Sequence, residues 1–217
     1  MDKKLPTATR ILSASRRLFN KKGYAATSLT EIAEEVGISQ GNLSYHFPTK
    51  MDLVVRLRQD ARRAAQARQA ALTPGAIADD YVEHLLFAMT MMWENRFVFR
   101  DRHQYADEKD ASETDAAMQA DFEELHGLLR RIEKEHLLRR DIPVELETLT
   151  RILWVVSRYW MDYLLEFEGQ EKVTWADQER GIEHHFAALF PYLVASARKD
   201  FRDALVRLSR DKQQPVL

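Results

Sequence analysis

Residues 40–46 bring three side chains suited to molecular recognition within about two helical turns of one another: Gln40, Asn42 and Tyr45. The amide groups of Gln and Asn donate and accept hydrogen bonds together, which is how they bind the edge of adenine. A tyrosine one turn further on can touch a thymine methyl group or a phosphate. Contacts of this kind select a base sequence only when a rigid element presents them together.

The surrounding residues 28–47 predict that element as two short helices joined by a tight turn. Ser28 and Glu31 form a Ser-x-x-Glu capping box, which satisfies free N–H groups at the start of a helix. The next apolar residues follow at helical spacing and give the first helix one apolar face: Leu29, Ile32, Ala33 and Val36.

A glycine and a small residue mark this pair as a helix-turn-helix motif. Gly37 stands where the first helix must stop, because glycine tolerates the left-handed conformation used there. Ser39 can cap the second helix, which Pro48 limits to about two turns. Ala33 lets the two helices cross closely while Leu43 points inward. The pattern therefore predicts an element that enters the DNA major groove.

The motif and its surroundings resemble the DNA-binding domain of the tetracycline-repressor (TetR) family of bacterial regulators. The resemblance covers residues 7–60, in which TRILSASRRLFNKKGYAATSLTEIAEEVGISQGNLSYHFPTKMDLV matches the family in order and spacing. Residues 9–22 match its first helix, with a core face of Ile11, Ala14, Leu18 and Phe19. In one departure, Asn42-Leu43-Ser44-Tyr45 replaces the family's frequent Thr/Ser-Leu-Tyr-x run.

The resemblance implies an all-α protein with two parts. Residues 1–50 are expected to form an N-terminal three-helix domain with the helix-turn-helix, followed by a connecting helix over residues 50–71. Residues 76–217 are expected to form a C-terminal helical domain for ligand binding and dimerisation. The implied function is a transcriptional regulator, foremost a ligand-responsive repressor that binds a palindromic operator as a dimer. A transcriptional activator or a global regulator on the same fold is the alternative.

Helix geometry and the resemblance together assign the expected DNA contacts. The start of the second helix enters the groove, which favours Gln40, Gly41 and Asn42 for base edges. The residues better placed for phosphates are Ser28 or Thr27, His46 and Lys50. The full set of expected DNA-binding residues is Thr27, Ser28, Ser39, Gln40, Gly41, Asn42, Tyr45, His46 and Lys50.

Charge is distributed unevenly along the chain, although the net charge is only −2. Residues 1–68 contain 13 Lys and Arg against 6 Asp and Glu, a net charge of +7. The remainder contains 19 basic and 28 acidic residues, a net charge of −9. Positive charge therefore collects where a phosphate-facing domain requires it. The alternative is that these side chains only solubilise exposed faces.

The rest of the chain predicts further helices. The expected elements are helices over 76–98 and 97–106, an acidic surface loop from Asp107 to Asp115, a long helix after it, an all-round apolar helix over 152–165, and a last long helix from Thr174 that kinks at Pro191. Residues 144–168 and 174–205 carry more apolar surface than one chain needs to bury. We expect a homodimer through these last two long helices, with Phe186 as an interface position.

A small, largely apolar effector is the expected partner of the C-terminal domain. Arg158 interrupts an apolar helix, where it can clamp an acidic group of a ligand or pair with Asp162 one turn on. Aromatic and Met residues at helical spacing can line a cavity, but they more often form plain core. The expected effector-binding residues are Tyr81, Leu85, Met89, Trp93, Phe97, Phe122, Leu125, Trp154, Arg158 and Tyr159.

An enzyme is the rival class, and its strongest pattern is a pair of Glu-x-x-His sequences, Glu123…His126 and Glu133…His136. In di-iron helical bundles such pairs come from different helices. Here both pairs fall on one predicted helix, about 80° out of phase, so they cannot converge on one metal. We expect no catalytic residue, no metal site and no cofactor.

Composition narrows the remaining classes. The 217 residues include no cysteine, which excludes disulfides and thiolate metal sites. The first residues, MDKKLPTATR, lack the apolar run of a signal peptide. No uninterrupted apolar segment reaches the roughly 18 residues typical of a membrane span. We therefore expect a cytoplasmic protein that binds double-stranded DNA and no membrane.

Overall fold

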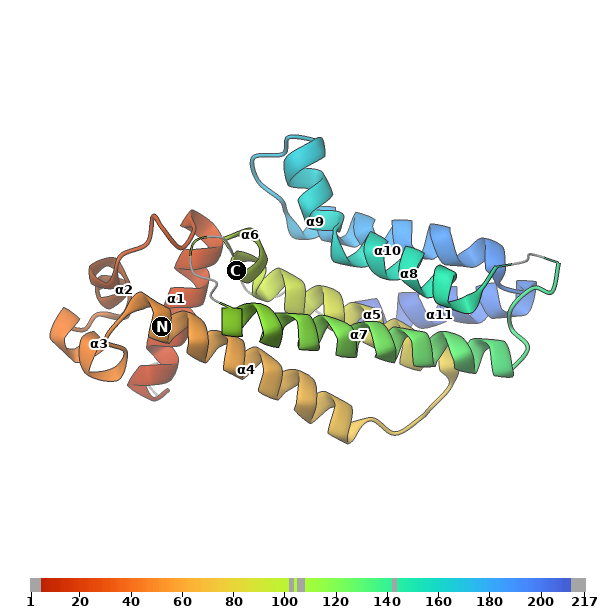
Figure 1. Cartoon of the computed structure of the whole chain (residues 1–217), viewed down its shortest axis with the longest axis horizontal. Helices are drawn as coiled ribbons and strands as arrows, with labels where there is room; N and C mark the ends of the chain where they lie inside the picture. The colour runs from red at the N-terminus through yellow and green to blue at the C-terminus, as the bar shows by residue number, and fades with distance from the viewer. Residues whose placement is uncertain (1–4, 102–103, 105–107, 142–143, 212–217) are drawn as a thin grey trace. The chain divides into compact units, whose positions relative to one another are not determined.

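A computed structural model describes residues 5–101, 104, 108–141 and 144–211. Apart from one isolated bridge between Leu138 and Leu193, these described residues contain no β-structure, which confirms the predicted all-α class (Figure 1). The helices are α1 (Thr7–Lys22), α2 (Leu29–Val36), α3 (Gln40–His46), α4 (Lys50–Ala71), α5 (Ile77–Glu94), α6 (Arg96–Arg100), α7 (Glu108–Lys134), α8 (Leu146–Arg158), α9 (Trp160–Asp162), a π-helix (Tyr163–Phe167), α10 (Trp175–Leu189), a 3₁₀ turn (Phe190–Tyr192) and α11 (Ala195–Asp211).

The chain divides into two compact units, each with its own apolar core. Of the described residues, the first unit takes the chain up to Leu72 and again Glu94–Ser112, and the second takes Thr73–Trp93 and the chain from Glu113 to Asp211. In the first unit α1, α2 and α3 close around a core that also receives Phe97 of α6, whose ring lies 5.3 Å from that of Phe19. The predicted core face of α1 is buried: Ile11, Ala14, Leu18 and Phe19.

Two helices begin at complete capping boxes. At the start of α4, the Thr49 N–H donates to Asp52 Oδ2 at 2.8 Å, and the Asp52 N–H donates to Thr49 Oγ1 at 3.2 Å. Thr174 and Asp177 make the same reciprocal pair before α10, at 2.8 and 3.3 Å. Each box satisfies two N–H groups that the helix itself cannot use.

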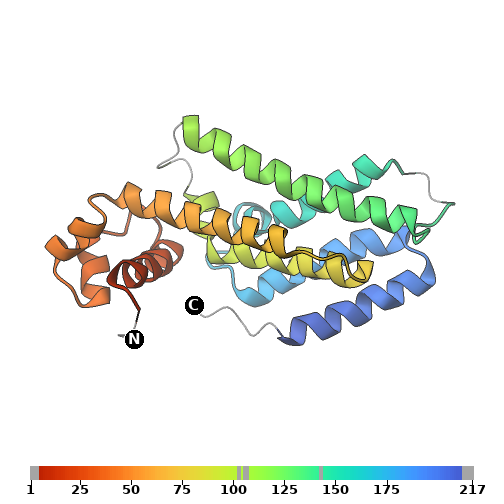
Figure 2. The ribbon, with the colours of Figure 1, turned by 90° about the horizontal axis from the view of Figure 1, so that it is seen from below.

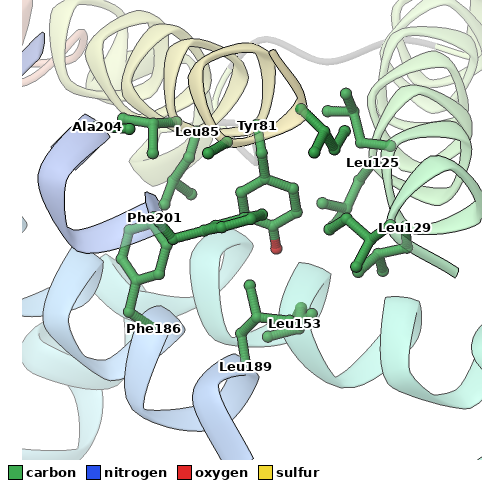
Figure 3. Close-up of a cluster of buried hydrophobic side chains, with 14 of the residues drawn as sticks. Tyr81, Leu85, Leu125, Leu129, Leu153, Phe186, Leu189, Phe201 and Ala204 are labelled. Atoms are coloured by element: carbon green, nitrogen blue, oxygen red, sulfur yellow. The ribbon is translucent and has the colours of Figure 1, made fainter. Parts of the chain in front are cut away.

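The long helices of the second unit lie lengthwise beside one another in both views (Figures 1 and 2). Five of them, α5, α7, α8, α10 and α11, send side chains into one core (Figure 3). Phe186 is in this core and is only 3% exposed, so the expectation that it lies at an interface is wrong. The other large members include Tyr81, Leu85, Met89, Leu129, Leu153, Leu189 and Phe201.

Several predicted boundaries differ from the structure. The acidic segment expected as a loop is helical from Glu108, because carboxylates near a helix N-terminus are stabilised by its dipole; Asp107 lies outside the described residues. Pro191 does not kink one long helix but separates two, since proline has no N–H to continue the ladder. Asn95 likewise divides the region expected as one helix over 76–98 into α5 and α6.

The segment expected to be apolar on all sides is covered on only part of its surface. Ile152, Val155 and Tyr159 of α8 are 43%, 45% and 47% exposed, although Leu149 and Leu153 beside them are fully buried. Packing within the core of one chain does not account for these three exposed apolar side chains. Separately, none of the described helices has the length and apolar character to cross a membrane.

Candidate nucleic-acid interface

The start of α2 joins that helix to the end of α1. Ser28 Oγ accepts a hydrogen bond from the Glu31 N–H at 3.1 Å, as the predicted cap requires. The Glu31 carboxylate, expected to complete the box, instead accepts a hydrogen bond from Lys22 Nζ. That hydrogen bond holds the pKa of Glu31 below its usual value. The capping box is therefore incomplete, and the Glu31 carboxylate forms an ion pair with the last residue of α1 in its place.

The turn between α2 and α3 has a closed hydrogen-bond pattern. Gly37 adopts φ 72° and ψ 43°, the left-handed conformation that glycine tolerates without strain. Its N–H donates to Glu34 O, and the Ile38 N–H donates to Ala33 O, each at 3.0 Å. Ala33 is 1% exposed and Leu43 is fully buried, so α2 and α3 meet through these two residues. The helix-turn-helix expected from the sequence is present.

The outer face of α3 carries the predicted recognition side chains. Tyr45 is 85% exposed, and its ring meets that of His46 edge to face, with centroids 5.4 Å apart. Ser39 Oγ accepts from the Asn42 N–H at 3.2 Å and so begins the helix. A tyrosine ring this exposed offers a large rigid contact surface. The exposed set comprises Ser39, Gln40, Gly41, Asn42, Tyr45 and His46.

Gln40 is oriented from α2. Its Oε1 accepts a hydrogen bond from Thr30 Oγ1 at 2.9 Å. This bond uses the acceptor side of the amide and leaves its two N–H donors available. The side chain is thus partly pre-organised for an acceptor on another molecule.

Two of the predicted DNA contacts have bonds inside the unit. Lys50 Nζ donates to the carbonyl oxygens of Tyr24 and Thr27, both at 2.8 Å, and lies 4.4 Å from the centroid of the Tyr24 ring. Thr27 is buried, and its Oγ1 donates to Gly23 O at 2.8 Å. The ammonium therefore organises the chain that leads into α2, while Ser28 next to it remains exposed.

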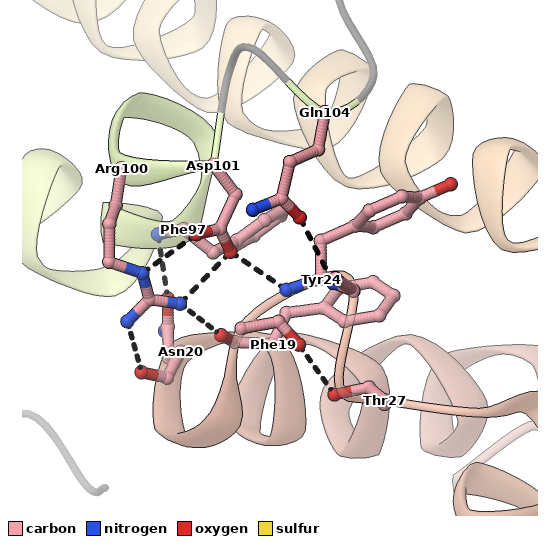
Figure 4. Close-up of polar contacts among 10 residues, drawn as sticks. Phe19, Asn20, Tyr24, Thr27, Phe97, Arg100, Asp101 and Gln104 are labelled. Atoms are coloured by element: carbon pink, nitrogen blue, oxygen red, sulfur yellow. Dashed lines mark hydrogen bonds and ion pairs between the residues drawn. The ribbon is translucent and has the colours of Figure 1, made fainter.

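A polar clamp that the sequence did not reveal attaches α6 to the end of α1 (Figure 4). Arg100 Nη2 donates to Phe19 O at 2.7 Å and Nη1 to Asn20 O at 3.1 Å, which satisfies carbonyl groups at the end of α1. Asp101 holds the guanidinium at 2.8 Å and accepts from the Tyr24 N–H at 2.8 Å. We call Asn20, Arg100 and Asp101 the α6 clamp.

The same clamp reaches the last residue of α5. Asn20 Nδ2 donates to Glu94 O at 2.7 Å, and Asn20 Oδ1 accepts from the Phe97 N–H at 3.1 Å. Arg16 also pairs with the Glu94 carboxylate at 3.3 Å. Phe97, predicted as an effector contact, is instead a fully buried core residue of the first unit. The partners are far apart in sequence, so no local pattern announces them.

The remaining predicted effector residues fall into two groups. Tyr81, Leu85, Met89 and Leu125 pack in the core of the second unit, and Trp93 meets Trp175 edge to face at 5.9 Å. Phe122, Trp154 and Tyr159 come together on the wall of a surface groove between α7 and α8, with a cavity volume of about 860 Å³. The other residues lining it are Met118, Gln119, Glu123, His126, Arg130, Glu147, Arg151 and Val155.

Arg158 lies beside this groove. Its guanidinium carbon is 5.2 Å from the centroid of the Tyr159 ring, within cation–π range. Burial raises the pKa of Asp162, and the charge of Arg158 opposes that shift. Both alternatives expected for Arg158, a ligand clamp and a partner of Asp162, are therefore compatible with its surroundings.

A chain of hydrogen bonds crosses the core of the second unit. Tyr81 Oη and Ser157 Oγ each lie 2.7 Å from a ring nitrogen of His185, and all three belong to different helices. Burial lowers the pKa of His185 to about 3, and nearby His84 adds to the shift. Burial also raises the pKa of Tyr81. Both side chains are therefore neutral at physiological pH and link α5, α8 and α10.

The histidines of the Glu-x-x-His patterns have other surroundings. His126 Nδ1 lies 2.9 Å from Thr150 Oγ1, and His136 lies beyond the end of α7 with a positive φ of 59°. Within the described ranges, no group of three or more His, Asp or Glu side chains is arranged to hold a metal ion.

A capped helix-turn-helix with an exposed polar face, carried by an all-α chain, is the architecture of the class of DNA-binding transcriptional regulators. Two family profiles match it: "Bacterial regulatory proteins, tetR family" over residues 11–57 and "Bacterial transcriptional repressor" over residues 57–201. Together they cover most of the sequence. The chain belongs to the TetR family.

Individual relatives agree with this assignment. The uncharacterized HTH-type transcriptional regulator YerO of Bacillus subtilis (strain 168) is 33% identical over 101 residues, which cover 40% of this chain and 35% of YerO. The chain thus spans about a third of the length of that curated relative.

Solved structures share the fold. A TetR-family transcriptional regulator from Marinobacter aquaeolei VT8 has a TM-score of 0.71 at 19% identity, covering 94% of this chain and 98% of that one. A putative transcriptional regulator from Saccharomonospora viridis, in complex with choline, has a TM-score of 0.64 at 19% identity, covering 83% and 95%.

Proposed function

We propose that this TetR-family chain is a ligand-responsive repressor, which binds a palindromic operator as a dimer and leaves it when a small, largely apolar effector binds. The observation that carries the proposal is the outer face of α3. There Gln40, Asn42 and Tyr45 project from a helix whose start is capped by Ser39 and which Leu43 anchors in the core. The family profile over residues 57–201 is described as a repressor, which favours repression over activation.

The first turn of α3 makes the base contacts in this proposal. Gln40 and Asn42 pair with adenine edges, Gly41 lets the backbone approach, and Tyr45 contacts a thymine methyl group or a phosphate. The hydroxyl groups of Ser28 and Ser39 accept hydrogen bonds as caps, and their O–H donors remain for phosphates. His46 is exposed at the other end of α3 and is assigned to a phosphate.

Thr27 and Lys50 support this surface indirectly. Both already bond to the chain around residues 23–27, so their first effect is to fix the entry into α2. Lys50 can then contact a phosphate only through an N–H of its ammonium group that its bonds to the two carbonyl groups do not use.

The exposed strip on α8 and the following π-helix is the proposed dimer surface, and we call it the apolar stripe. Its residues recur at helical spacing, and Phe167 at its end is 79% exposed. Large apolar side chains aligned on one surface favour a partner that covers them. A two-fold dimer also places two copies of α3 on successive major grooves. The members are Ile152, Tyr163 and Phe167, whereas Val155 and Tyr159 line the groove between α7 and α8.

The α6 clamp supplies the route from effector to operator. Through Asn20 and Arg100, the end of α1 is bonded to the end of α5 and to α6. A ligand that favours another position of α5 therefore also favours another position of the helix-turn-helix, by population shift. Coupling of about 1–3 kcal/mol changes operator affinity roughly 5- to 150-fold. That a structurally similar regulator was solved with choline favours a small organic effector in general.

Transcription in a purified system tests the mode of action. Purified protein is added to a promoter that carries a sequence selected by the protein itself. We expect transcription to fall as the protein is added. A rise in transcription overturns repression in favour of the alternative, an activator on the same fold.

A further inference from the structure

The groove between α7 and α8 has the size of a small-molecule site. Its volume is about 860 Å³, within the roughly 300–1,000 Å³ common for ligand pockets. Asp121 of α7 contacts Trp154 of α8, and His126 contacts Thr150, so the two helices run antiparallel. The groove consequently has two different ends, each made by both helices.

One end is aromatic and rigid. Phe122 and Trp154 meet at 78° with centroids 6.1 Å apart, and Trp154 and Tyr159 meet at 82° and 6.2 Å. Trp154 Nε1 donates to Asp121 Oδ2 at 2.8 Å, which fixes the indole against rotation. Three rings at near right angles form walls that suit a flat aromatic body.

The other end is positively charged. Arg151 Nη2 is paired with Glu147 Oε1 at 2.6 Å, so those two charges offset each other. Arg130 also lines this end, and among the described residues it has no ion pair. A guanidinium binds carboxylate, sulfonate and phosphate groups in a fork of two hydrogen bonds. Glu123, the carboxylate nearer the rings, already accepts from Gln119 Nε2 at 2.8 Å.

We propose that this groove binds an amphiphilic organic anion. Its aromatic body lies among Phe122, Trp154 and Tyr159, and its anionic head lies on Arg130. The proposal rests on the proposed function for its biological role, because this ligand is then the effector, but it can be tested without DNA. It also separates the predicted effector residues, since only the three aromatic ones and not the core group touch the ligand.

Two fluorescent probes that differ in one group test the charge and the place together. Anilinonaphthalene sulfonate carries an aromatic body and an anionic head, and N-phenylnaphthylamine carries the same rings without the sulfonate. With the full chain, we expect saturable binding of both probes. Arg130→Gln should weaken the sulfonate about tenfold and leave the neutral probe unchanged. Arg140→Gln, an exposed arginine outside the groove, is the matched control.

The aromatic end has its own variant. Tyr159→Ala should weaken both probes by a similar factor, of order tenfold, because both use the same rings. Thermal unfolding of each variant shows whether it is folded. Equal weakening of the two probes by Arg130→Gln overturns the anionic head. Binding that is unchanged in both Tyr159→Ala and Arg130→Gln overturns the site.

Operator binding, measured in parallel, separates this proposal from the proposed function. Probe binding that follows the pattern above supports the groove even if operator affinity does not change, and that result contradicts only the effector role. If neither probe binds and Arg130→Gln alters the sedimenting mass, the groove is a contact between copies of the chain. That outcome overturns the ligand proposal and leaves DNA recognition by α3 intact.

Discussion

The outer face of α3 and the groove between α7 and α8 are built in opposite ways. The face of α3 comes from exposed residues within one short stretch of sequence, on a helix fixed by Ser39 and by the buried Leu43. The groove comes from two long helices: its Phe122 and Trp154 rings are half-buried, and a tertiary bond to Asp121 holds the Trp154 indole. A surface of the first kind depends on local geometry, whereas a site of the second kind depends on the packing of a whole unit.

This difference also separates the forces at the two sites. The first unit carries the excess of positive charge, so contacts to phosphates there should weaken steeply with added salt. The groove is lined by rings and by a nearly balanced set of charges, so its affinity should depend mainly on the area it covers.

The largest expected effect comes from the apolar stripe. Ile152→Glu places a charge in the proposed dimer surface without touching α3, and it should give a monomer of 25.3 kDa. Loss of the second recognition helix should weaken operator binding by about 10²–10⁴-fold. Sedimentation and operator titration measure both effects. Val206→Glu, exposed on α11 outside the stripe, is the control and should change neither.

Acid should destabilise the second unit through His185. Its pKa is about 3 in the folded chain against an ordinary 6.5, so the unfolded chain binds the extra proton as pH falls below 6.5. The stability from this neutral ring is fully present above pH 6.5 and is lost toward pH 3, about 2.7 kcal/mol by pH 4.5.

Denaturant unfolding at several pH values tests this linkage, with His185→Gln as the comparison. The variant should lose this part of the pH dependence while keeping a polar partner for Tyr81. If wild type and variant have the same slope between pH 6.5 and 4.5, the buried neutral state of His185 is refuted.

Replacement of one base-reading side chain should have a smaller and more selective effect. Asn42→Ala should cost roughly 1–3 kcal/mol at one or two operator positions and leave binding to random DNA nearly unchanged. Affinity for a panel of single-base operator variants measures the change. Uniform weakening across the panel would mean that Asn42 contacts the backbone and not a base.

Lys50→Met should have the smallest effect, and mostly on stability. It removes the hydrogen bonds to Tyr24 O and Thr27 O, which at this half-buried site should cost about 1 kcal/mol. The salt dependence of DNA binding should fall by at most about one unit of slope. A large drop in slope at unchanged stability would show that Lys50 serves chiefly as a phosphate contact.

Local patterns predicted the first unit well. The caps at Ser28 and Ser39, the glycine turn and the core face of α1 each depend on residues within a few positions of one another. Helical class and the start of α10 followed from the same kind of signal. What short-range chemistry determines can be read from one sequence.

Tertiary contacts account for what the sequence did not reveal. Arg100 bonds to Phe19 across 81 positions, and no periodicity encodes that pairing. Helical spacing shows that Phe186 and Tyr159 are each on an apolar face, but not that the first is core and the second exposed. The Glu31 carboxylate could accept a hydrogen bond either from the N–H at the start of its own helix or from Lys22. The position at which α1 ends brings Lys22 to it.

Selection of bound sequences from random duplex DNA tests the central claim, recognition by the outer face of α3. Wild-type protein should enrich a sequence with two half-sites related by a two-fold axis, about 10–10.5 base pairs apart or a multiple of this. The variant with Gln40, Asn42 and Tyr45 all replaced by alanine should still bind DNA weakly and enrich nothing. Enrichment of the same sequence by both proteins, or of none by the wild type, would contradict the account.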